Sequence, residues 1–169
     1  MSAAEDHRRM APETLGFAVV TVSDSRAVAE DESGALVRRL AAEAGHHVEM
    51  STLVHDDVAA IRRALGQILA TPGIDVVVVT GGTGFAPRDL TTEAAVPLFE
   101  RVVEGFGELF RMLSYRQVGA AAMLSRAAAG MAFGRAIFLL PGSPKAVDLA
   151  MRELILPEAA HLISQARRS

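Results

Sequence analysis

The chain has 169 residues, of which 50% are hydrophobic and 22% are charged, a composition that is ordinary for a globular protein. Its formal net charge of −3 argues against a nucleic-acid-binding protein, which would usually carry a basic face. Because the chain contains no cysteine, disulfides, cysteine-bound metals and thiol chemistry are excluded.

No targeting or membrane segment is predicted. The N-terminal stretch lacks the apolar core of a signal peptide, and no apolar run is long enough to span a membrane. We therefore expect a cytoplasmic protein without a membrane partner. The length predicts one domain over residues 15–169, and the polar composition of residues 1–14 predicts a flexible tail.

Apolar runs without polar alternation predict strands that are buried on both faces of a parallel sheet. Phe17–Val22 and Val76–Val79 are such runs, and His46–Val54 is a more polar strand suited to a place nearer the sheet edge. Apolar residues at helical spacing predict helices over residues 36–44 and 58–69, which alternate with these strands.

The second half of the chain predicts shorter elements. In chain order these are a helix start near Thr92 that Pro97 kinks or ends, an extended piece over 101–103, a helix over 106–113, a helical turn over 120–124, an antiparallel hairpin over 127–131 and 135–140, and a helix from Pro144 to about Arg167 with a bend at Pro157.

The order of elements predicts an α/β fold with three layers, α/β/α, around a mostly parallel central sheet that carries a late antiparallel hairpin. Carboxyl ends of parallel strands lie at the same sheet edge, where ligands bind in open α/β sheets. We therefore expect Asp24, Asp56, Asp89, the Gly81–Gly84 loop and the Pro141–Lys145 turn to gather there.

The loop Gly81-Gly82-Thr83-Gly84 directly follows the central strand. Three glycines in four positions let a ligand approach the backbone closely, and successive amides in such a loop can bind an anion. The loop is not a P-loop, because it lacks the Gly-Lys-Ser/Thr ending. It is not a dinucleotide fingerprint either, because it lacks the third glycine of the G-x-G-x-x-G spacing. A tight turn without a ligand is the alternative interpretation.

Three carboxylates, Asp24, Asp56 and Asp89, follow predicted strands. They would repel an anion unless a hard cation is present, and Mg²⁺ is typically held by one or two carboxylates together with substrate phosphates. Alternatively, Asp56 or Asp57 caps the second helix and Asp24 orders a turn. Asp89 is the strongest candidate because it lies nearest the glycines.

Lys145 follows a Gly-Ser-Pro turn at a predicted helix start, where amides, a hydroxyl and an ammonium suit a phosphate or carboxylate. Helix-start chemistry with a solvated lysine explains the pattern equally well. Ser143 has no GxSxG context, so a hydrolase triad is not indicated. The residues alone thus predict an α/β protein that binds a phosphorylated small molecule, with Mg²⁺ and phosphoryl or nucleotidyl chemistry.

Several motifs carry a resemblance to a known family. They are TVSDSR (21–26), DESG (31–34), VVVTGGTGFAPRDLTTEA (77–94), EGFGELFRMLS (104–114), LSRAAAG (124–130) and LPGSPKAV (140–147). In this order they resemble the MoaB/MogA family of molybdenum cofactor biosynthesis, which has a molybdopterin-binding, MogA-like fold. The resemblance covers about residues 17–160 and is closer to the MoaB-type branch.

The resemblance implies an adenylyltransferase. The terminal phosphate of molybdopterin would attack the α-phosphate of Mg-ATP, giving adenylyl-molybdopterin and pyrophosphate. Asp56 and Asp89 match two acidic positions that the A-type enzymes need for catalysis, and both are candidate Mg²⁺ ligands. Gly81, Gly82, Thr83 and Gly84 would hold molybdopterin, Gly142, Ser143, Pro144 and Lys145 would close the other side of the pocket, and Ser23 and Asp24 would line it near the nucleotide.

Two alternatives remain from the same resemblance. A non-catalytic molybdopterin-binding or carrier protein would bind the ligand without releasing pyrophosphate, and a purely structural domain would bind neither pterin nor nucleotide. The family also forms trimers, and often hexamers in the B-type branch, so we expect a homo-oligomer. Apolar residues such as Phe106, Phe110 and Met112 are consistent with a subunit interface.

Overall fold

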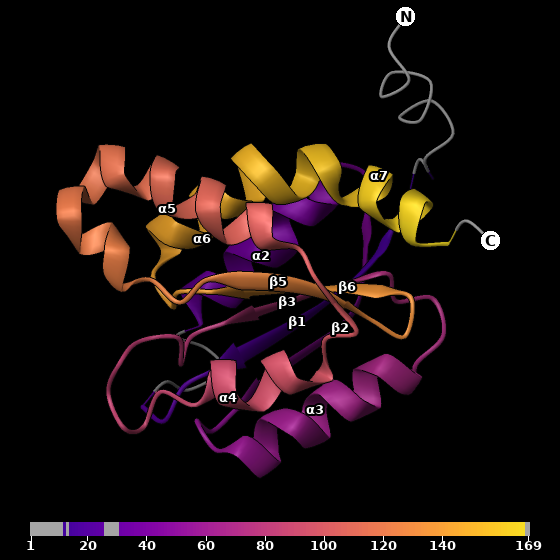
Figure 1. The fold of residues 1–169 in the computed structure, drawn as a ribbon. Coiled ribbons are helices and arrows are strands. Elements are labelled where there is room, and N and C mark those ends of the chain that lie inside the picture. The colour runs from indigo at the N-terminus through magenta and orange to yellow at the C-terminus, as the bar shows by residue number, and fades with distance from the viewer. Residues whose placement is uncertain (1–11, 13, 26–30, 168–169) are drawn as a thin grey trace, which may run out of the picture.

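A six-stranded sheet lies at the centre of the computed structural model, which describes residues 12, 14–25 and 31–167 (Figure 1). Most of the predicted tail therefore lies outside the described residues. The strands are β1 (Gly16–Val22), β2 (His47–Val54), β3 (Val76–Thr80), β4 (Arg101–Val102), β5 (Ala128–Ala132) and β6 (Arg135–Leu140).

The strand order is β2-β1-β3-β6-β5-β4. β1 pairs in parallel with β2 and β3, and β3 pairs in parallel with β6. β5 is antiparallel to both β6 and β4, so it is the one strand of the described sheet that runs against the others. The four parallel strands consequently end at one edge, while the Phe133-Gly134 turn lies at the opposite edge with positive φ at both residues.

Burial explains why the strand sequences differ. Every residue of β1 and β3 is buried, as their unalternated apolar sequences predict for strands that are covered on both faces. β2 contains only exposed and half-buried residues, as expected for an edge strand that has a neighbour on one side only. The prediction of a more peripheral place for this strand is confirmed.

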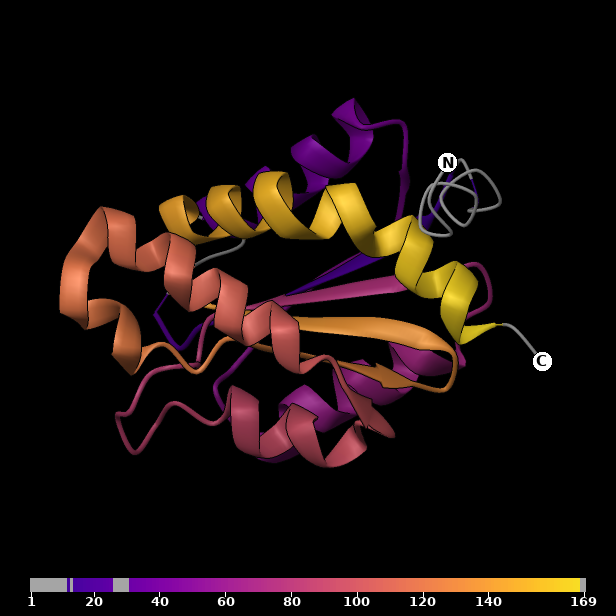
Figure 2. The ribbon, with the colours of Figure 1, turned by 45° about the horizontal axis from the view of Figure 1, so that its top comes forward.

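Helices cover both faces of the sheet (Figures 1 and 2). One layer contains α2, α5, α6 and α7, and the other contains α3 and α4. Their bounds are α2 (Glu32–Glu43), α3 (Val58–Ala70), α4 (Thr91–Ala95), α5 (Glu104–Val118), α6 (Pro144–Ala150) and α7 (Leu156–Ala166), with 3₁₀ turns η2 (Val96–Leu98) and η3 (Gly119–Leu124).

Two apolar cores follow from the alternation of side chains along the strands. Phe17, Val19 and Val78 face the core beneath α2 and α5–α7. Ala18 and Val77, one position along, face the core beneath α3 and α4. This arrangement confirms the predicted three-layer α/β fold with a mostly parallel sheet and a late antiparallel hairpin.

The final helical stretch contains a local irregularity. A π-helical turn, η4 (Met151–Ile155), joins α6 to α7 and ends two residues before Pro157. Proline has no N–H to donate to the carbonyl four residues earlier, so the backbone must depart from regular α-helix there. Among the described residues, no helix combines the length and apolar character needed to cross a membrane.

Candidate functional site

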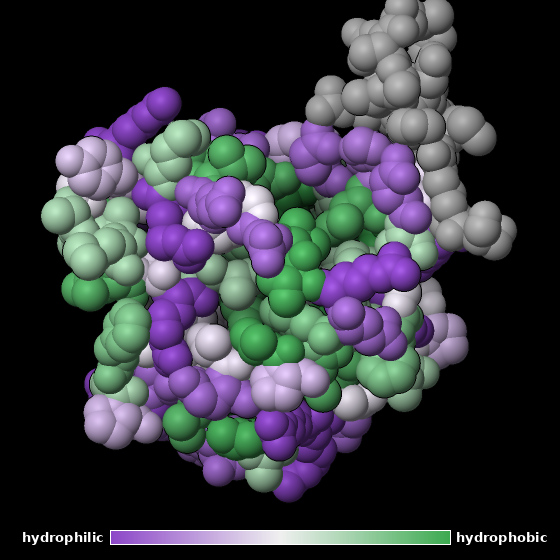
Figure 3. All heavy atoms as spheres, viewed as in Figure 1, coloured by the Kyte–Doolittle hydropathy of each residue, from purple (hydrophilic) through white to green (hydrophobic). Residues whose placement is uncertain are grey.

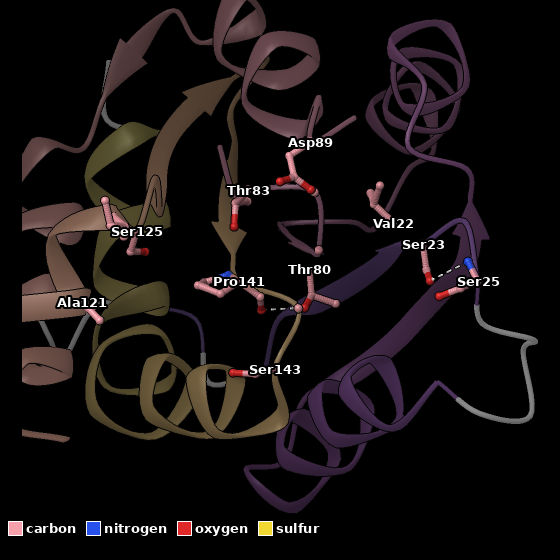
Figure 4. A pocket seen from close by; sticks show the side chains of 15 residues that line it. Val22, Ser23, Ser25, Thr80, Thr83, Asp89, Ala121, Ser125, Pro141 and Ser143 are labelled. Carbon is pink, nitrogen blue, oxygen red and sulfur yellow. Dashed lines mark hydrogen bonds between the residues drawn. The ribbon is translucent and has the colours of Figure 1, made fainter. Parts of the chain in front are cut away.

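The loops that follow β1, β3 and β6 enclose a cavity of about 530 Å³ at the carboxyl edge of the sheet. In Figure 4, Asp89 and Thr83 lie on one side of it, Pro141 and Ser143 on another, and Ser125 and Ala121 on a third. The lining residues are Val22, Ser23, Ser25, Thr80, Gly81, Gly82, Thr83, Gly84, Asp89, Ala121, Leu124, Ser125, Pro141, Gly142 and Ser143.

The Gly81–Gly84 loop forms the floor of the site. Gly81 and Gly82 have φ values of 97° and 64°, which only glycine adopts without strain. The Gly81 N–H donates to the Leu140 carbonyl at 3.0 Å and so joins β3 to β6. Within the described part of the chain, the amides of Gly82, Thr83 and Gly84 donate to no protein acceptor. Three successive amides are therefore available to an anion.

Asp89 is packed directly against this loop. Its Oδ2 accepts the Ala86 N–H at 2.9 Å, and its carboxylate lies so close to Gly84 that a Cβ there would overlap it. Gly84 is thus required by close approach of a side chain, whereas Gly81 and Gly82 are required by their backbone angles. Asp89 also lines the cavity. The structure therefore brings a carboxylate next to the open amides.

Thr91, at the start of α4, holds the loop from below. Its hydroxyl donates to the Gly81 carbonyl at 2.7 Å, and its N–H donates to the Gly82 carbonyl at 3.0 Å. Thr91 is fully buried, so these bonds are shielded from water. The hydroxyl and amide together fix the two glycine carbonyls on the side away from the cavity.

Asp56 lies behind the loop rather than among the residues that line the cavity. Its Oδ1 accepts the Leu90 N–H at 2.8 Å, and its own N–H donates to Asp24 Oδ1 at 2.9 Å. A Cβ on Gly82 would overlap the Asp56 carboxylate. Asp57 instead caps α3 by accepting the Ala60 N–H at 2.8 Å. The alternative that Asp57 is a helix cap is confirmed, and Asp56 is the residue directed toward the loop.

The electrostatics of Asp56 are unfavourable for ionisation. Burial raises the pKa of this carboxyl, and the negative charges of Asp89, Asp24 and Glu93 raise it further. The hydrogen bond from the Leu90 amide acts in the opposite direction, because it favours the ionised form. A cation near these carboxylates would relieve the repulsion between them.

The turn after β6 forms a second wall. Ser143 caps α6 by accepting the Ala146 N–H at 3.2 Å, and it lines the cavity together with Gly142. The Ser33 hydroxyl donates to the Gly142 carbonyl at 2.8 Å, while the Thr80 hydroxyl donates to the Pro141 carbonyl at 3.0 Å (Figure 4). This turn is therefore tied to both α2 and β3.

Pro144 and Lys145 lie beyond this wall. They line an adjoining groove of about 1000 Å³, which shares Ala121, Ser125, Pro141 and Ser143 with the cavity. Lys145 is exposed, and the same groove also contains Arg39 and Arg152. The structure thus places Lys145 next to the cavity but not among its lining residues.

Some residues at the site were not singled out from the sequence. Ser25, Ala121, Leu124 and Ser125 line the cavity, the last three from the region around η3.

Asp31 belongs to an acidic cluster that the sequence associates with an enzyme. In the structure it is buried, caps α2 through the Gly34 N–H at 2.8 Å and accepts the Thr21 hydroxyl at 2.7 Å. Its role is structural, because it stabilises the helix start beside β1.

Arg126 is a further residue that the sequence did not single out. It follows η3 and contacts the loop over residues 83–93. Its guanidinium donates to the carbonyls of Thr83 and Asp89 at 3.3 and 2.9 Å, and it forms an ion pair with Glu93. The LSRAAAG motif contained it, but its contacts depend on the packing of segments distant in the chain.

A magnesium ion at this site would need ligands from a substrate in addition to those from the protein. Among the described residues, no group of three or more histidine, cysteine or acidic side chains could hold a metal ion. Asp56 and Asp89 each give one carboxylate oxygen to a backbone N–H. Because Mg²⁺ is usually held by one or two carboxylates plus substrate phosphates, this donor set fits a cation that arrives with a phosphate.

Comparison with known proteins identifies the family. A family model described as a probable molybdopterin binding domain matches residues 18–161. The chain belongs to this family. Molybdenum cofactor biosynthesis protein B of Bacillus subtilis (strain 168) is 44% identical over 165 residues, which cover 97% of each chain.

Solved structures agree with this assignment. A crystal structure of a molybdenum cofactor biosynthesis protein B superposes with a TM-score of 0.90 at 43% identity, covering 95% of this chain and 100% of that one. The tungsten cofactor synthesizing protein MoaB from Pyrococcus furiosus gives a TM-score of 0.85 at 42% identity, covering 94% and 100%. The predicted MoaB/MogA resemblance and its fold are confirmed, and the family's role is molybdenum cofactor biosynthesis.

Proposed function

We propose that this protein adenylylates molybdopterin. A terminal phosphate oxygen of molybdopterin attacks the α-phosphorus of ATP, a new P–O bond forms, and the bond from the α-phosphorus to the bridging oxygen of the β-phosphate breaks. Pyrophosphate leaves with the electron pair of that bond, and adenylyl-molybdopterin remains. The reaction brings two anions together, so catalysis requires donors that align and neutralise them.

The observation that carries this proposal is the set of open amides at Gly82, Thr83 and Gly84, which line the cavity beside Asp89. Successive backbone N–H groups bind phosphate without a charged side chain. We assign them to the molybdopterin phosphate. Gly142 and Ser143 line the opposite wall. We assign Ser23, which lines the cavity, and its neighbour Asp24, which does not, to the side of the nucleotide. Lys145 and Pro144, in the adjoining groove, are assigned to its outer rim.

Asp89 and Asp56 are the proposed catalytic carboxylates. Asp89 lines the cavity and lies where it can orient the reacting phosphates, while Asp56 supports the loop from behind and adds negative charge. Asp89 would hold Mg²⁺ together with the ATP phosphates, whereas Asp56, behind the loop, would act on the ion only through its negative charge. The ion would neutralise charge that develops on the phosphoryl oxygens. The amides and Asp89 then keep the attacking oxygen aligned with the α-phosphorus.

One observation favours a second candidate, a molybdopterin-binding or carrier protein without catalysis. Asp56 does not line the cavity, and its carboxylate holds the Leu90 amide in place. A residue used in this way can serve loop architecture alone. The carrier would keep the open amides and bind molybdopterin, but it would gain nothing from ATP.

The test is pyrophosphate release from Mg-ATP by the purified protein, with and without molybdopterin, alongside equilibrium binding of molybdopterin. The adenylyltransferase predicts release that depends on molybdopterin. Binding without release would select the carrier. If neither molybdopterin nor ATP binds, both candidates are wrong.

We also propose a homo-oligomer, a trimer or a hexamer, in the cytoplasm. Large apolar side chains are exposed along α5 and η3; they include Met112, Tyr115, Val118, Met123 and Leu124. In Figure 3 green atoms gather at the end of the molecule where Figure 1 draws α5 and the turn that follows it. Exposed apolar side chains that gather in one region of the surface mark interaction sites. Light scattering that reports a stable monomer would contradict the proposal.

A further inference from the structure

We propose that Arg126 is a positioning residue for the reaction, because it fixes the segment between Thr83 and Asp89, two residues that line the cavity. The inference rests on the proposed function, since it concerns how Asp89 is held relative to the open amides. Arg126 itself is not among the cavity-lining residues. It therefore acts through the residues that it holds, without touching the substrates.

The contacts of Arg126 connect both ends of this segment to one rigid group. Nε donates to the Thr83 carbonyl at 3.3 Å and Nη2 donates to the Asp89 carbonyl at 2.9 Å. The guanidinium carbon also lies 5.3 Å from the centre of the Phe85 ring, a cation–π contact within the same segment. One side chain thus fixes the start, the middle and the end of the loop.

Glu93 fixes the guanidinium in turn. Its two carboxylate oxygens accept from Nη1 and Nη2, which is the paired geometry that arginine favours with carboxylates. The hydrogen bond from Arg126 lowers the pKa of Glu93, so the pair is charged at neutral pH. Only 21% of the Arg126 side chain is exposed. The ion pair with Glu93 on α4 therefore holds the guanidinium in the orientation in which it can donate to the carbonyls of Thr83 and Asp89.

Little else holds this segment. Residues 85–88 are exposed, and the internal bonds of the turn run only between Ala86 and Asp89. Thr91 fixes Gly81 and Gly82 but not the residues beyond them. Without the guanidinium, the backbone from Gly84 to Asp89 would be held only by the bonds of its flanking residues, Gly82 to Thr91 and Leu90 to Asp56, and by the Ala86–Asp89 turn. The carboxylate of Asp89 would then no longer have a fixed place beside the amides.

Arginine is specifically required for this arrangement. Its planar fork donates in several directions at once, whereas the lysine ammonium is a compact group on a flexible chain. Arg126→Lys keeps the positive charge near Asp89 and Glu93 but cannot reach both carbonyls and the carboxylate together. If the residue mattered only through its charge, Arg126→Lys would behave like the wild type.

The experiment compares Arg126→Lys with Arg62→Lys. Arg62 contacts the same helix, α4, through the carbonyls of Ala94 and Glu93 at 3.3 and 3.4 Å, but within the described residues it donates no hydrogen bond to residues 83–89. We measure kcat and KM for molybdopterin-dependent pyrophosphate release, and amide hydrogen exchange by mass spectrometry. Arg126→Lys should lower kcat roughly tenfold to a hundredfold while KM changes less than about threefold, because a small misplacement of reacting groups costs rates of this order. Arg62→Lys should leave both within about twofold.

Hydrogen exchange separates this inference from the proposed function. In Arg126→Lys, peptides covering residues 82–90 should exchange faster, and peptides from β1, β3 and α7 should exchange as in the wild type. Exchange at 82–90 that matches the wild type would overturn the inference, as would faster exchange throughout the protein. If the wild type releases no pyrophosphate, the proposed function fails, and the exchange measurement still decides whether Arg126 holds the loop.

Discussion

The two edges of the sheet use the same residue types for opposite purposes. At the amino edge, Asp75 accepts the Gly16 N–H at 2.8 Å and pairs with Arg167 near the end of the chain. At the carboxyl edge, the neighbours of Asp56 include the carboxylates of Asp89 and Asp24. At the amino edge the carboxylate has a hydrogen-bond donor and a cation as partners. At the carboxyl edge several carboxylates lie close together and repel one another.

This difference between the two edges indicates which carboxylates are functional. A carboxylate that accepts a buried amide and pairs with a cation has its hydrogen bonds and charge satisfied within the fold. Carboxylates that repel each other beside three open amides reduce stability unless a ligand compensates them, and such perturbed groups in a cleft are candidate functional residues. The contrast between the edges predicts that substitutions at one edge change activity and substitutions at the other change stability.

The largest effect is expected from Gly82→Ala. Alanine would have to adopt a φ of 64°, and its Cβ would overlap the Asp56 carboxylate and the Thr91 hydroxyl. The loop must shift, so molybdopterin binding should weaken by about a hundredfold or more, with a loss of unfolding free energy of about 1–3 kcal/mol. Gly66→Ala is the matched control, because a Cβ at this position in α3 meets nothing within 4 Å. It should stabilise the protein by about 0.5–1 kcal/mol without changing binding.

Asp56→Asn should act in opposite directions on activity and stability. Asparagine can still accept the Leu90 N–H but cannot carry charge, so pyrophosphate release should fall about tenfold or more. Because the pKa of Asp56 is raised in the folded protein, its stabilising contribution belongs to the protonated form and is lost as pH rises through that pKa.

Removing the charge of Asp56 should therefore raise Tm at pH 7, by no more than about 2 °C, and the difference from the wild type should shrink as the pH falls toward about 4. Thermal unfolding of both proteins across this pH range is the measurement. A variant that is less stable than the wild type at pH 7 would show that the carboxylate is satisfied in the folded protein.

Asp75→Ala tests the opposite edge. The substitution leaves the buried Gly16 amide without its acceptor and removes the partner of Arg167, so the free energy of unfolding should fall by about 1–3 kcal/mol. Denaturant titration measures this loss. Activity per folded molecule should not change. A fall in kcat of tenfold or more would contradict the assignment of stability to the amino edge and activity to the carboxyl edge.

The smallest effect is expected from Asp57→Ala. This residue is adjacent to Asp56 but serves as the cap of α3, so its loss should cost about 1 kcal/mol of stability. Pyrophosphate release should stay within about twofold of the wild type. A loss of activity equal to that of Asp56→Asn would mean that the two neighbouring carboxylates share one function.

The sequence predicted what local patterns determine. Val76–Val79 could be recognised as a buried strand, and the parallel order implied that the loops after the strands share an edge. The sequence could not decide between Asp56 and Asp57, because both follow β2 and only the packing of α3 makes Asp57 its cap. Arg126 could not be chosen either, since its acceptors lie 37 and 43 residues away in the chain. Tertiary contacts of this kind leave no periodic signal.

The most direct test of the account is molybdopterin-dependent pyrophosphate release by Asp89→Asn, measured with its molybdopterin affinity. Asp89 lines the cavity, and an asparagine side chain can still accept the Ala86 N–H, so the loop should keep its shape. The account predicts binding within about threefold of the wild type and release reduced by about a hundredfold or more. Wild-type release from Asp89→Asn would contradict the assignment of catalysis to the carboxyl edge of the sheet.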